Sequence, residues 1–396
     1  MRFLVIFLFS VQLLSAQVWV KLADFPAQKR DDGVAVVVNN KAYFGTGLIE
    51  WANTSDFYVL DLTNYSWNTM AAMPNGAERQ YACAFAGQNC FYVFGGAGTG
   101  GVLNTLYKYN VGTNTWIQVS SKPGNGLSGA ACMNFGDKIL ISGGRFPSGK
   151  VSPEVWEYTI STDSWMQKND YPFVARWRSS ATVHNNAGYL IFGRDSGGAY
   201  CKEFYKYTPA TDNWTKIMDF PGIKGRSYAS LNVANNQLFV FGGTDTLDFL
   251  YKDLWYFKET TTTWVQGPDI PASGRKGGMS CSYDDKFFYT CGIGEGPARL
   301  TETWMTDIPV GIKEHRPSGK FNVYPNPTNG PVHVRCADKN LIHVTCIYED
   351  LSGRVLGSMD LKAEDRINLS SLNPGIYILK LYSGKTLVEI KRIVKD

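Results

Sequence analysis

Arginine recurs at one position of a repeating sequence, and aromatic residues lie close to it. The recurring arginines are Arg30, Arg79, Arg176, Arg226 and Arg275. Tyr81, Trp177 and Tyr228 follow three of them within two residues, and Trp51 lies in a predicted loop. A guanidinium forms paired hydrogen bonds with a carboxylate, and an aromatic face covers the apolar part of a ligand. These residue types together point to a site for a carboxylate-bearing or carbohydrate ligand.

The recurrence itself leaves two interpretations open. Each arginine is either a structural strut that hydrogen-bonds loop carbonyls of the adjacent repeat, or a part of the binding surface. Ligand sites usually break repeat symmetry and lie on loops. The better candidates for a specific contact are therefore the residues outside the repeat pattern, namely Trp51, Arg145, Trp177, Arg178 and Arg194. The full candidate set adds Arg79, Tyr81, Arg226 and Tyr228.

Histidine is too scarce for most metal and acid–base centres. His184 is the only histidine in residues 17–308. No Cys/His spacing suits zinc, and no serine-hydrolase, zinc-protease or phosphate-binding motif occurs. We therefore expect no metal, no cofactor and no catalytic residue. An enzyme would need a carboxylate beside the arginines, and the candidates in predicted loops are Glu50, Glu154, Glu203 and Glu295.

Charge and the N-terminal segment limit the partners and the location. The formal net charge is +4 over 396 residues, without a basic stripe or charge run, so nucleic acid is not an expected partner. Residues 1–16 are predicted to be a signal peptide, because Arg2 precedes a short apolar run that ends in small residues. No other stretch approaches the length of a transmembrane segment.

A tryptophan marks a repeat of 48 to 50 residues. Its six copies are Trp19, Trp67, Trp116, Trp165, Trp214 and Trp264. An apolar run ending in glycine follows each copy, and three of these runs end in glycine pairs: Gly95 and Gly96, Gly143 and Gly144, Gly242 and Gly243. Each unit predicts four short strands whose apolar inner members are covered on both faces, for example a first strand at 79–86. This pattern is typical of sheets stacked around an axis, with the tryptophans between neighbouring sheets.

We therefore predict an all-β fold with a six-bladed β-propeller over residues 17–308. Residues 17–25 form an outer strand with no inner strands before it, and residues 275–307 supply three strands with no outer one. The N-terminal strand is expected to complete the last blade and close the ring. The glycine pairs and tryptophans resemble the kelch repeat family, although the first, fourth and sixth units lack the full pair. The resemblance implies a channel mouth that binds peptides.

A second domain follows a predicted linker at 309–320. Residues 321–396 alternate short strands with Gly, Asn and Pro turns, which predicts a small Ig-like β-sandwich. Cys336 and Cys346 are the most plausible disulfide pair in the chain, and free thiols remain an equal alternative.

The turns of this second domain carry a set of motifs in a fixed order. Their residues include Tyr324, Pro325, Asn326, Pro327, Gly330, Gly353, Arg354, Gly375 and Tyr377. They resemble the type A C-terminal sorting domain of the type IX secretion system, a family found in Bacteroidetes. The resemblance implies passage through the periplasm and across the outer membrane, with the secretion machinery as a partner. An accessory Ig-like module that stays attached is the alternative.

These features predict a secreted or cell-surface protein that binds an extracellular protein, peptide or glycan without catalysis. The alternative is a sugar-processing enzyme that resembles the kelch-type sialic acid mutarotase, which is also exported and six-bladed.

Overall fold

The computed structural model describes residues 19–309, 321–336, 344–350, 354–361, 364–384 and 386–396. These residues form strands throughout, with one short 3-10 helix, η1 (Pro209–Thr211). None of the helices in these ranges is long and apolar enough to cross a membrane. The chain divides into two compact units, Met1–Ile312 and Lys313–Asp396. The predicted signal peptide and almost all of the predicted linker lie outside the described residues.

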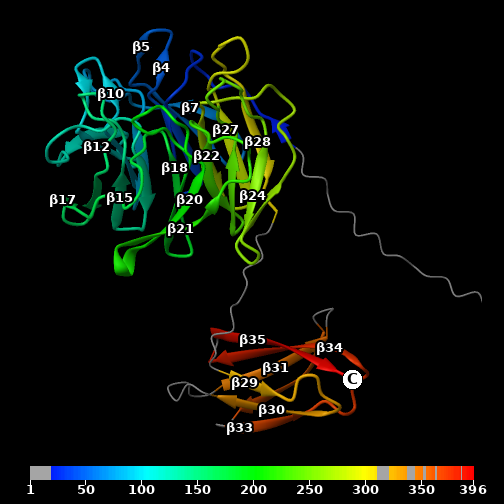
Figure 1. Ribbon diagram of the computed structural model, residues 1–396. Coiled ribbons are helices and arrows are strands. Elements are labelled where there is room, and N and C mark those ends of the chain that lie inside the picture. The colour runs from blue at the N-terminus through cyan, green and yellow to red at the C-terminus, as the bar shows by residue number, and fades with distance from the viewer. Residues whose placement is uncertain (1–18, 310–320, 337–343, 351–353, 362–363, 385) are drawn as a thin grey trace, which may run out of the picture. The chain divides into compact units, whose positions relative to one another are not determined.

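Six antiparallel four-stranded sheets make up the first unit (Figure 1). From the innermost strand outward, sheet 1 is β2 (Val34–Val38), β3 (Lys41–Gly45), β6 (Phe57–Asp61) and β7 (Trp67–Thr69); sheet 2 is β8 (Cys83–Gly87), β9 (Cys90–Phe94), β12 (Leu106–Asn110) and β13 (Thr115–Val119); sheet 3 is β14 (Ala131–Asn134), β15 (Lys138–Ser142), β16 (Val155–Thr159) and β17 (Ser164–Gln167). Sheet 4 is β18 (Ser180–His184), β19 (Ala187–Ile191), β20 (Glu203–Thr208) and β21 (Asn213–Asp219); sheet 5 is β22 (Ser230–Ala234), β23 (Gln237–Phe241), β24 (Leu254–Lys258) and β25 (Thr263–Gln266); sheet 6 is β26 (Met279–Tyr283), β27 (Lys286–Thr290), β28 (Thr303–Asp307) and β1 (Trp19–Lys21).

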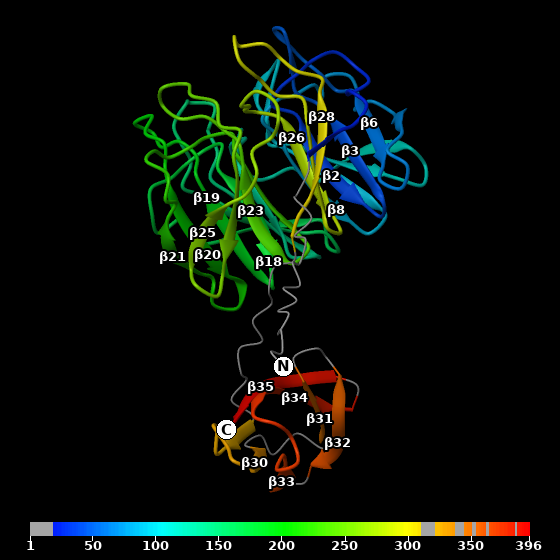
Figure 2. The ribbon, with the colours of Figure 1, turned by 90° about the vertical axis from the view of Figure 1, so that its right-hand side faces the viewer.

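The innermost strands surround a central channel. β2, β8, β14, β18, β22 and β26 contact one another in this order, and β26 also contacts β2, beside which it lies in Figure 2. The channel has a volume of about 660 Å³ and is lined by small side chains such as Ala84, Cys132 and Ser280. β1 pairs with β28 through Trp19 and Thr306, so sheet 6 joins strands from both ends of the unit. This arrangement is a β-propeller.

The strands form where the apolar runs predict them, and one boundary differs. We expected the first strand of sheet 2 at 79–86, but β8 begins at Cys83. Tyr81 has a φ of 57°, in the left-handed region, which ends extended pairing before the strand begins. The second strand, β9, is buried along its whole length, as expected for a sheet with both faces covered.

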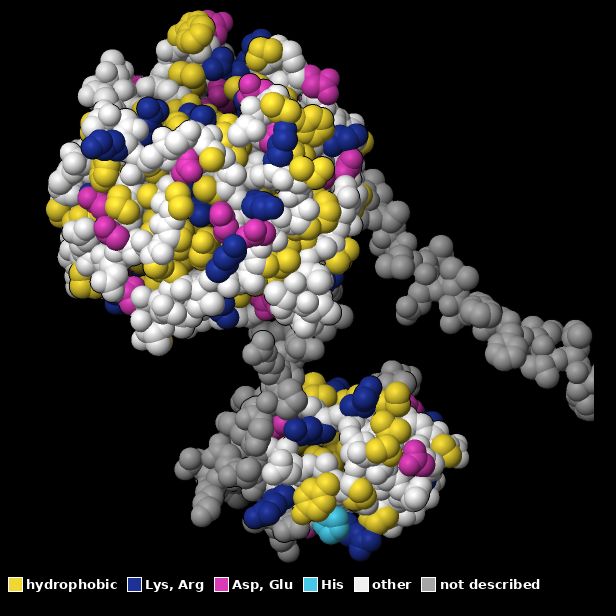
Figure 3. Space-filling view, in the orientation of Figure 1, with side chains coloured by type: hydrophobic (Ala, Val, Ile, Leu, Met, Phe, Trp, Pro, Cys, Tyr) yellow, Lys and Arg dark blue, Asp and Glu magenta, His cyan; other side chains and the backbone are white. Residues whose placement is uncertain are grey.

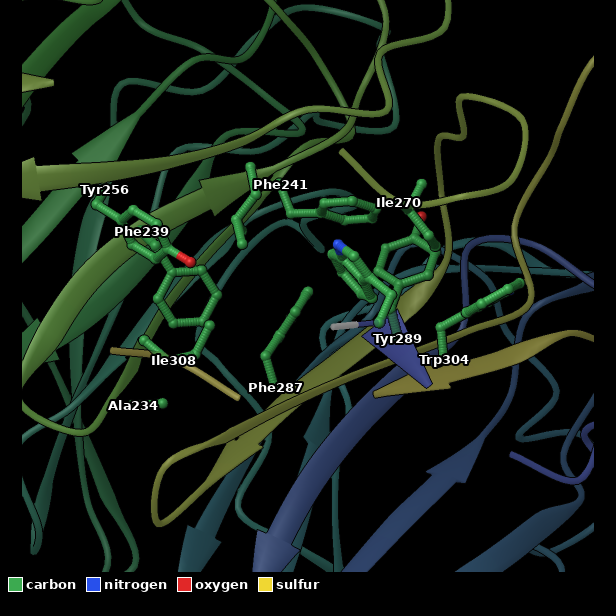
Figure 4. Packing of buried hydrophobic residues seen from close by; sticks show 11 residues of the cluster. Ala234, Phe239, Phe241, Tyr256, Ile270, Phe287, Tyr289, Trp304 and Ile308 are labelled. Atoms are coloured by element: carbon green, nitrogen blue, oxygen red, sulfur yellow. The ribbon is translucent and has the colours of Figure 1, made fainter. Parts of the chain in front are cut away.

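The recurring tryptophans pack between neighbouring sheets. Trp116 of sheet 2 lies 5.0 Å from Phe57 of sheet 1, measured between ring centroids, and donates a hydrogen bond to the Ala71 carbonyl at 2.9 Å. Trp19 likewise lies 5.1 Å from Phe241 of sheet 5. Figure 4 shows this cluster between sheets 5 and 6, where further aromatic residues fill the same space. Aromatic side chains therefore contribute to the apolar packing between sheets.

The second glycine of each pair is present in all six sheets, unlike the first. Gly96 has a φ of 93°, and a Cβ there would lie 2.6 Å from the Gln80 carbonyl oxygen. The corresponding glycines are Gly47, Gly144, Gly193, Gly243 and Gly292. At the first position, Thr46, Phe192 and Cys291 replace glycine in sheets 1, 4 and 6 and keep a positive φ. The departures from the pair therefore preserve the backbone conformation.

Two short hairpins lie at one end of the propeller, at the top of Figure 1. They are β4 (Leu48–Ile49) with β5 (Ala52–Asn53), and β10 (Ala97–Gly98) with β11 (Gly101–Val102). Both lie in the long loops that follow the glycines.

The second unit consists of two sheets that share one core. The three-stranded sheet is β29 (Phe321–Tyr324), β30 (Pro331–Cys336) and β33 (Glu364–Asn368); the four-stranded sheet is β32 (Val355–Leu361), β31 (Val344–Asp350), β34 (Gly375–Ser383) and β35 (Thr386–Lys395). Val332 and Val334 from the first sheet and Leu379 from the second are fully buried in this core. Cys346 is also buried there as a free thiol, and the side chain of Cys336 lies outside the described residues, so their pairing stays a prediction.

Several motif residues fix the turns of this unit. Asn326, after β29, donates a hydrogen bond to the Arg392 carbonyl at 2.7 Å and accepts one from the Val394 amide at 2.8 Å. The Tyr377 hydroxyl bonds to the Asn373 carbonyl at 2.7 Å. Gly353 lies outside the described residues. The motif therefore connects β29 to the last strand of the chain.

Candidate ligand-binding site

The five recurring arginines are buried struts. Arg30 forms a bidentate pair with Asp56 at 2.6 and 2.8 Å, and Arg226 forms one with Asp253 at 2.6 Å for both bonds. Arg176 and Arg275 each donate a single hydrogen bond, to Glu203 at 3.3 Å and to Glu302 at 3.1 Å. Each carboxylate lies at the start of the third strand of the same sheet. The arginine therefore ties the segment before the innermost strand to the third strand.

These contacts decide between the two interpretations for the repeated position. Arg79 and Arg226, both predicted as ligand contacts, are only 1% and 2% exposed. The carbonyls that they bond are those of Gly95 and Gly242, in their own sheets and not in the adjacent repeat as we expected. The structure therefore favours the structural interpretation for both residues.

Sheets 2 and 3 vary this strut. Arg79 faces Thr105 where the other sheets have a carboxylate, and burial lowers its pKa to about 10. Sheet 3 has Leu127 in place of arginine, and Lys122 occupies the position of the missing cation. Its ammonium lies 3.3 Å from Glu154 and 4.3 Å from the centre of the Trp156 ring. The sequence analysis did not single out Lys122, because it precedes the repeat position by five residues.

Two residues beyond the strut, one residue from each sheet forms a ring around the axis, which we call the axial ring. Its members are Asp32, Tyr81, Gly129, Arg178, Tyr228 and Gly277. All six have a φ between 54° and 66°. This conformation is uncommon for residues other than glycine and is frequent at functional sites.

Backbone hydrogen bonds connect the axial ring from sheet to sheet. The Asp32 amide donates to the Gly277 carbonyl at 2.7 Å, which joins sheets 1 and 6. Tyr81 donates to Asp32 at 3.0 Å, and Gly129 donates to Tyr81 at 2.8 Å. Arg178 donates to Gly129 at 2.7 Å. The left-handed conformation therefore accompanies a backbone hydrogen bond from Asp32, Tyr81, Gly129 and Arg178 to the neighbouring sheet.

Arg178 lies at the centre of an aromatic cluster. Its guanidinium carbon lies 3.9 Å from the centre of the Trp177 ring, 4.1 Å from Tyr228 and 4.2 Å from Tyr81. These rings supply cation–π attraction and exclude water. The structure thus brings together four of the predicted site residues.

Two further predicted arginines also lie near the Trp177 ring. The guanidinium carbons of Arg145 and Arg194 lie 5.0 and 5.8 Å from the Trp177 ring centre. Among the described residues, neither they nor Arg178 has a carboxylate partner within ion-pair distance. Trp51, which is 96% exposed between β4 and β5, has no contact with this cluster among the described residues. We call Arg145, Trp177, Arg178 and Arg194 the arginine cluster.

A buried carboxyl group lies beside the arginine cluster. Asp32 is 7% exposed, and burial raises its pKa well above the ordinary range, together with the nearby charge of Asp31. Arg178 and a hydrogen bond from Tyr81 act in the opposite direction. Burial and the charge of Asp32 raise the pKa of Tyr81 to about 12. Asp31 itself pairs with Arg299. The Asp32 carboxyl is therefore held in its neutral form at pH values where ordinary carboxyls are ionised.

The axial ring encloses a small cavity of about 150 Å³. Asp32, Tyr81, Arg178 and Tyr228 line it, and Gly129 and Gly277 leave it open. Within the described residues, Oδ2 of Asp32 and Nε of Arg178 have no hydrogen-bond partner. Buried polar atoms normally have one. The cavity therefore presents a neutral hydrogen-bonding carboxyl and a cation to a small polar group.

Asp32 is the site residue that the sequence analysis missed. Its signal is a column two residues after the repeated arginine, where residue types differ although the next column always holds a small residue. The glutamates that we considered as acid/base groups lie elsewhere. Glu154 and Glu203 are the carboxylates of struts, and Glu50 and Glu295 are exposed.

The propeller face seen in Figure 3 has no patch of a single charge sign, because cationic and anionic side chains are interspersed there. In the described part of the chain, no group of three His, Cys, Asp or Glu residues is arranged to hold a metal ion.

Comparisons with known proteins agree with both expected resemblances. Residues 322–396 match the Secretion system C-terminal sorting domain, which confirms the second. No match was found among the curated proteins. A solved structure titled "Structure of YjhT" is similar at a TM-score of 0.63 and 18% identity, over 71% of this chain and 96% of that one, and shows the fold alone. Residues 6–193 and 129–312 match the KLHDC2/KLHL20/DRC7 Kelch-repeats domain, which confirms the expected resemblance to kelch repeats. The chain therefore belongs to the kelch-repeat family.

Proposed function

We propose that this protein is a non-catalytic binding module outside the cell. Its ligand site, here called the axial site, consists of the axial ring and the arginine cluster and takes a carboxylate of a protein, peptide or glycan. Residues 17–308 form a six-bladed kelch propeller that β1 closes. Residues 309–320 are a linker, and residues 321–396 form a β-sandwich that addresses the chain to type IX secretion after removal of residues 1–16. The six sheets, the contact of β26 with β2 and the shared core of the second unit support this organisation.

The single observation that carries the binding proposal is the arginine cluster. Four of the five strut arginines have a carboxylate partner in their own sheet, whereas Arg145, Arg178 and Arg194 converge on Trp177 without one among the described residues. Unpaired cations that share one aromatic surface favour an anionic ligand. The neutral state of Asp32 preserves this positive charge.

A glycan and peptide array probed with the full-length chain tests the proposal. Binding to carboxylate-bearing ligands should be lost in Arg178→Ala and Trp177→Ala. Lys150→Ala is the matched control, because Lys150 is an exposed cation in the same loop as Arg145 and has no contact with Trp177. Equal binding by Arg178→Ala and by the wild type would reject this site.

Export has its own test. A chain that lacks residues 321–396 should accumulate in the periplasm of a type IX-competent host, and fractionation with an antibody to the propeller measures this. Undiminished release into the medium would contradict the sorting assignment.

The alternative is a sugar-processing enzyme, and one observation favours it. An acid/base group needs a pKa near the working pH and a position beside a cationic clamp. Asp32 has a raised pKa and lies at the cavity with Arg178. Nuclear magnetic resonance of sugar anomers would detect catalysed interconversion, and loss of that activity in Asp32→Asn would replace the binding proposal with this one.

A further inference from the structure

Two cysteines from different blades approach each other beside the channel. Cys83 lies in β8, the innermost strand of sheet 2, and Cys132 lies in β14, the innermost strand of sheet 3. Both belong to one buried cluster between these sheets. β8 and β14 contain residue pairs whose Cα atoms lie within 8 Å. The strands are therefore close enough for side chains to bridge them.

The side chains of both cysteines pack against the same buried cluster between sheets 2 and 3. Sγ of Cys132 lies 3.3 Å from the carbonyl oxygen of Ala84, the residue that follows Cys83. Cys132 thus crosses from sheet 3 to the backbone of sheet 2. Sγ of Cys83 lies 4.0 Å from the carbonyl oxygen of Phe94, in the same space between the sheets. The neighbouring Cys132 thiol and burial raise the pKa of Cys83 well above its ordinary value.

We propose that Cys83 and Cys132 form a disulfide that links the second and third blades once the chain has left the cytoplasm. Export follows from the sorting domain at 322–396, and exported proteins meet oxidising conditions. The inference does not depend on the ligand of the axial site.

The reaction balances as a thiol–disulfide exchange. A disulfide oxidant, either a small molecule or a thiol–disulfide oxidoreductase, accepts the two electrons. The two Sγ atoms form one bond and lose their protons, and the oxidant's sulfur–sulfur bond breaks to give two thiols. Cys132 is the point of entry, because it lines the channel of about 660 Å³. The raised pKa of Cys83 makes it the slower nucleophile.

Peptide mapping tests the pairing. The full-length chain is equilibrated with hydroxyethyl disulfide, unfolded in the presence of iodoacetamide and digested without reductant. The expected result is a cross-linked peptide pair that contains Cys83 and Cys132 and separates after reduction. Recovery of both cysteines alkylated, joined only to the reagent, or paired with other cysteines would overturn the proposal.

A matched variant identifies the partners. Cys281 also lines the channel and is buried, but it lies in sheet 6, so Cys281→Ser should keep the cross-link. Cys132→Ser should lose it and leave Cys83 alkylated. If Cys132→Ser does not fold, Cys83→Ala gives the same information. Reduction should lower the thermal unfolding midpoint of the wild type and leave that of Cys83→Ala unchanged, and an equal response in both proteins would reject the disulfide.

Discussion

The ammonium group of Lys122 lies 3.3 Å from the Glu154 carboxylate, at the place where four other sheets put an arginine. Five of the six sheets have a carboxylate in this strut, and its cation comes from either of two positions in the repeat. In sheets 3, 5 and 6 the same carboxylate also accepts a hydrogen bond from a tryptophan two residues later, such as Trp156 at 2.8 Å. In these sheets the carboxylate is therefore held both by the cation and by a tryptophan of the third strand.

Replacement of Lys122 by methionine should destabilise the propeller. Methionine keeps the contact with the Trp156 ring but leaves Glu154 without its cation. Glu154 is 23% exposed, so water offsets part of the loss, and we expect the free energy of unfolding to fall by about 2 kcal/mol. Urea unfolding followed by tryptophan fluorescence measures this change.

The double variant Lys122→Met/Glu154→Gln is the control for this pair. Glutamine removes the uncompensated charge and keeps the hydrogen bond from Trp156, so the double variant should be more stable than Lys122→Met alone. An equal or lower stability of the double variant would show that the charge pair does not contribute.

Ligand binding at the axial site should weaken as pH rises. Below its raised pKa, Asp32 is neutral and donates a hydrogen bond, while Arg178 keeps its full charge for the ligand. As pH rises through that value, Asp32 ionises, repels a carboxylate and neutralises Arg178. Affinity should therefore be highest on the acidic side and fall with increasing pH, which titration calorimetry at several pH values measures.

The variant Asp32→Asn separates this effect from other titrations. Asparagine resembles the neutral carboxyl in shape and cannot ionise, so the affinity of the variant should stay level over the same pH range. Stability follows the same sign, because the folded protein retains a proton that the unfolded chain releases at the ordinary carboxyl pKa. The wild type should lose stability between these two pKa values, and Asp32→Asn should not. A parallel pH dependence of both proteins would assign the effect to another group.

Arg145 and Arg194 should act on binding through their charge. Arg145 is exposed and Arg194 is half-buried, and both guanidinium groups lie farther from the Trp177 ring than that of Arg178 does. Glutamine at either position should weaken binding by a few-fold and reduce its salt dependence. Lys150→Gln should change neither the affinity nor its salt dependence. An equal effect of Lys150→Gln would show that the arginines act only through the general positive charge of this face.

The sequence predicts the parts of this molecule that repeat. Trp116 and its copies, the glycine before each loop and the apolar inner strands carry local signals at a constant spacing, so the propeller could be recognised without coordinates. The axial ring has the same constant spacing, but its residue types differ from sheet to sheet. The approach of Asp32 to Tyr81 follows only when strands from different sheets converge on the axis. Lys122 was not predicted for a related reason, since it supplies the cation of the strut from a different position in the repeat. The strut role of Arg79 depended on burial, which a recurrence alone does not reveal.

Gly96→Ala tests the close approach that recurs in all six sheets. The added Cβ would lie 2.6 Å from the Gln80 carbonyl oxygen, and the φ of 93° is itself unfavourable for alanine. Gly101 is the matched control, because its φ is 110° and a Cβ there meets nothing within 4 Å. Gly101→Ala should cost about 1–2 kcal/mol for the backbone conformation alone. Gly96→Ala should cost about 1–3 kcal/mol more, because the backbone at Gln80, before β8, must move away from the added methyl group. Equal unfolding free energies for the two variants would mean that the glycine is needed only for its conformation and not for the contact.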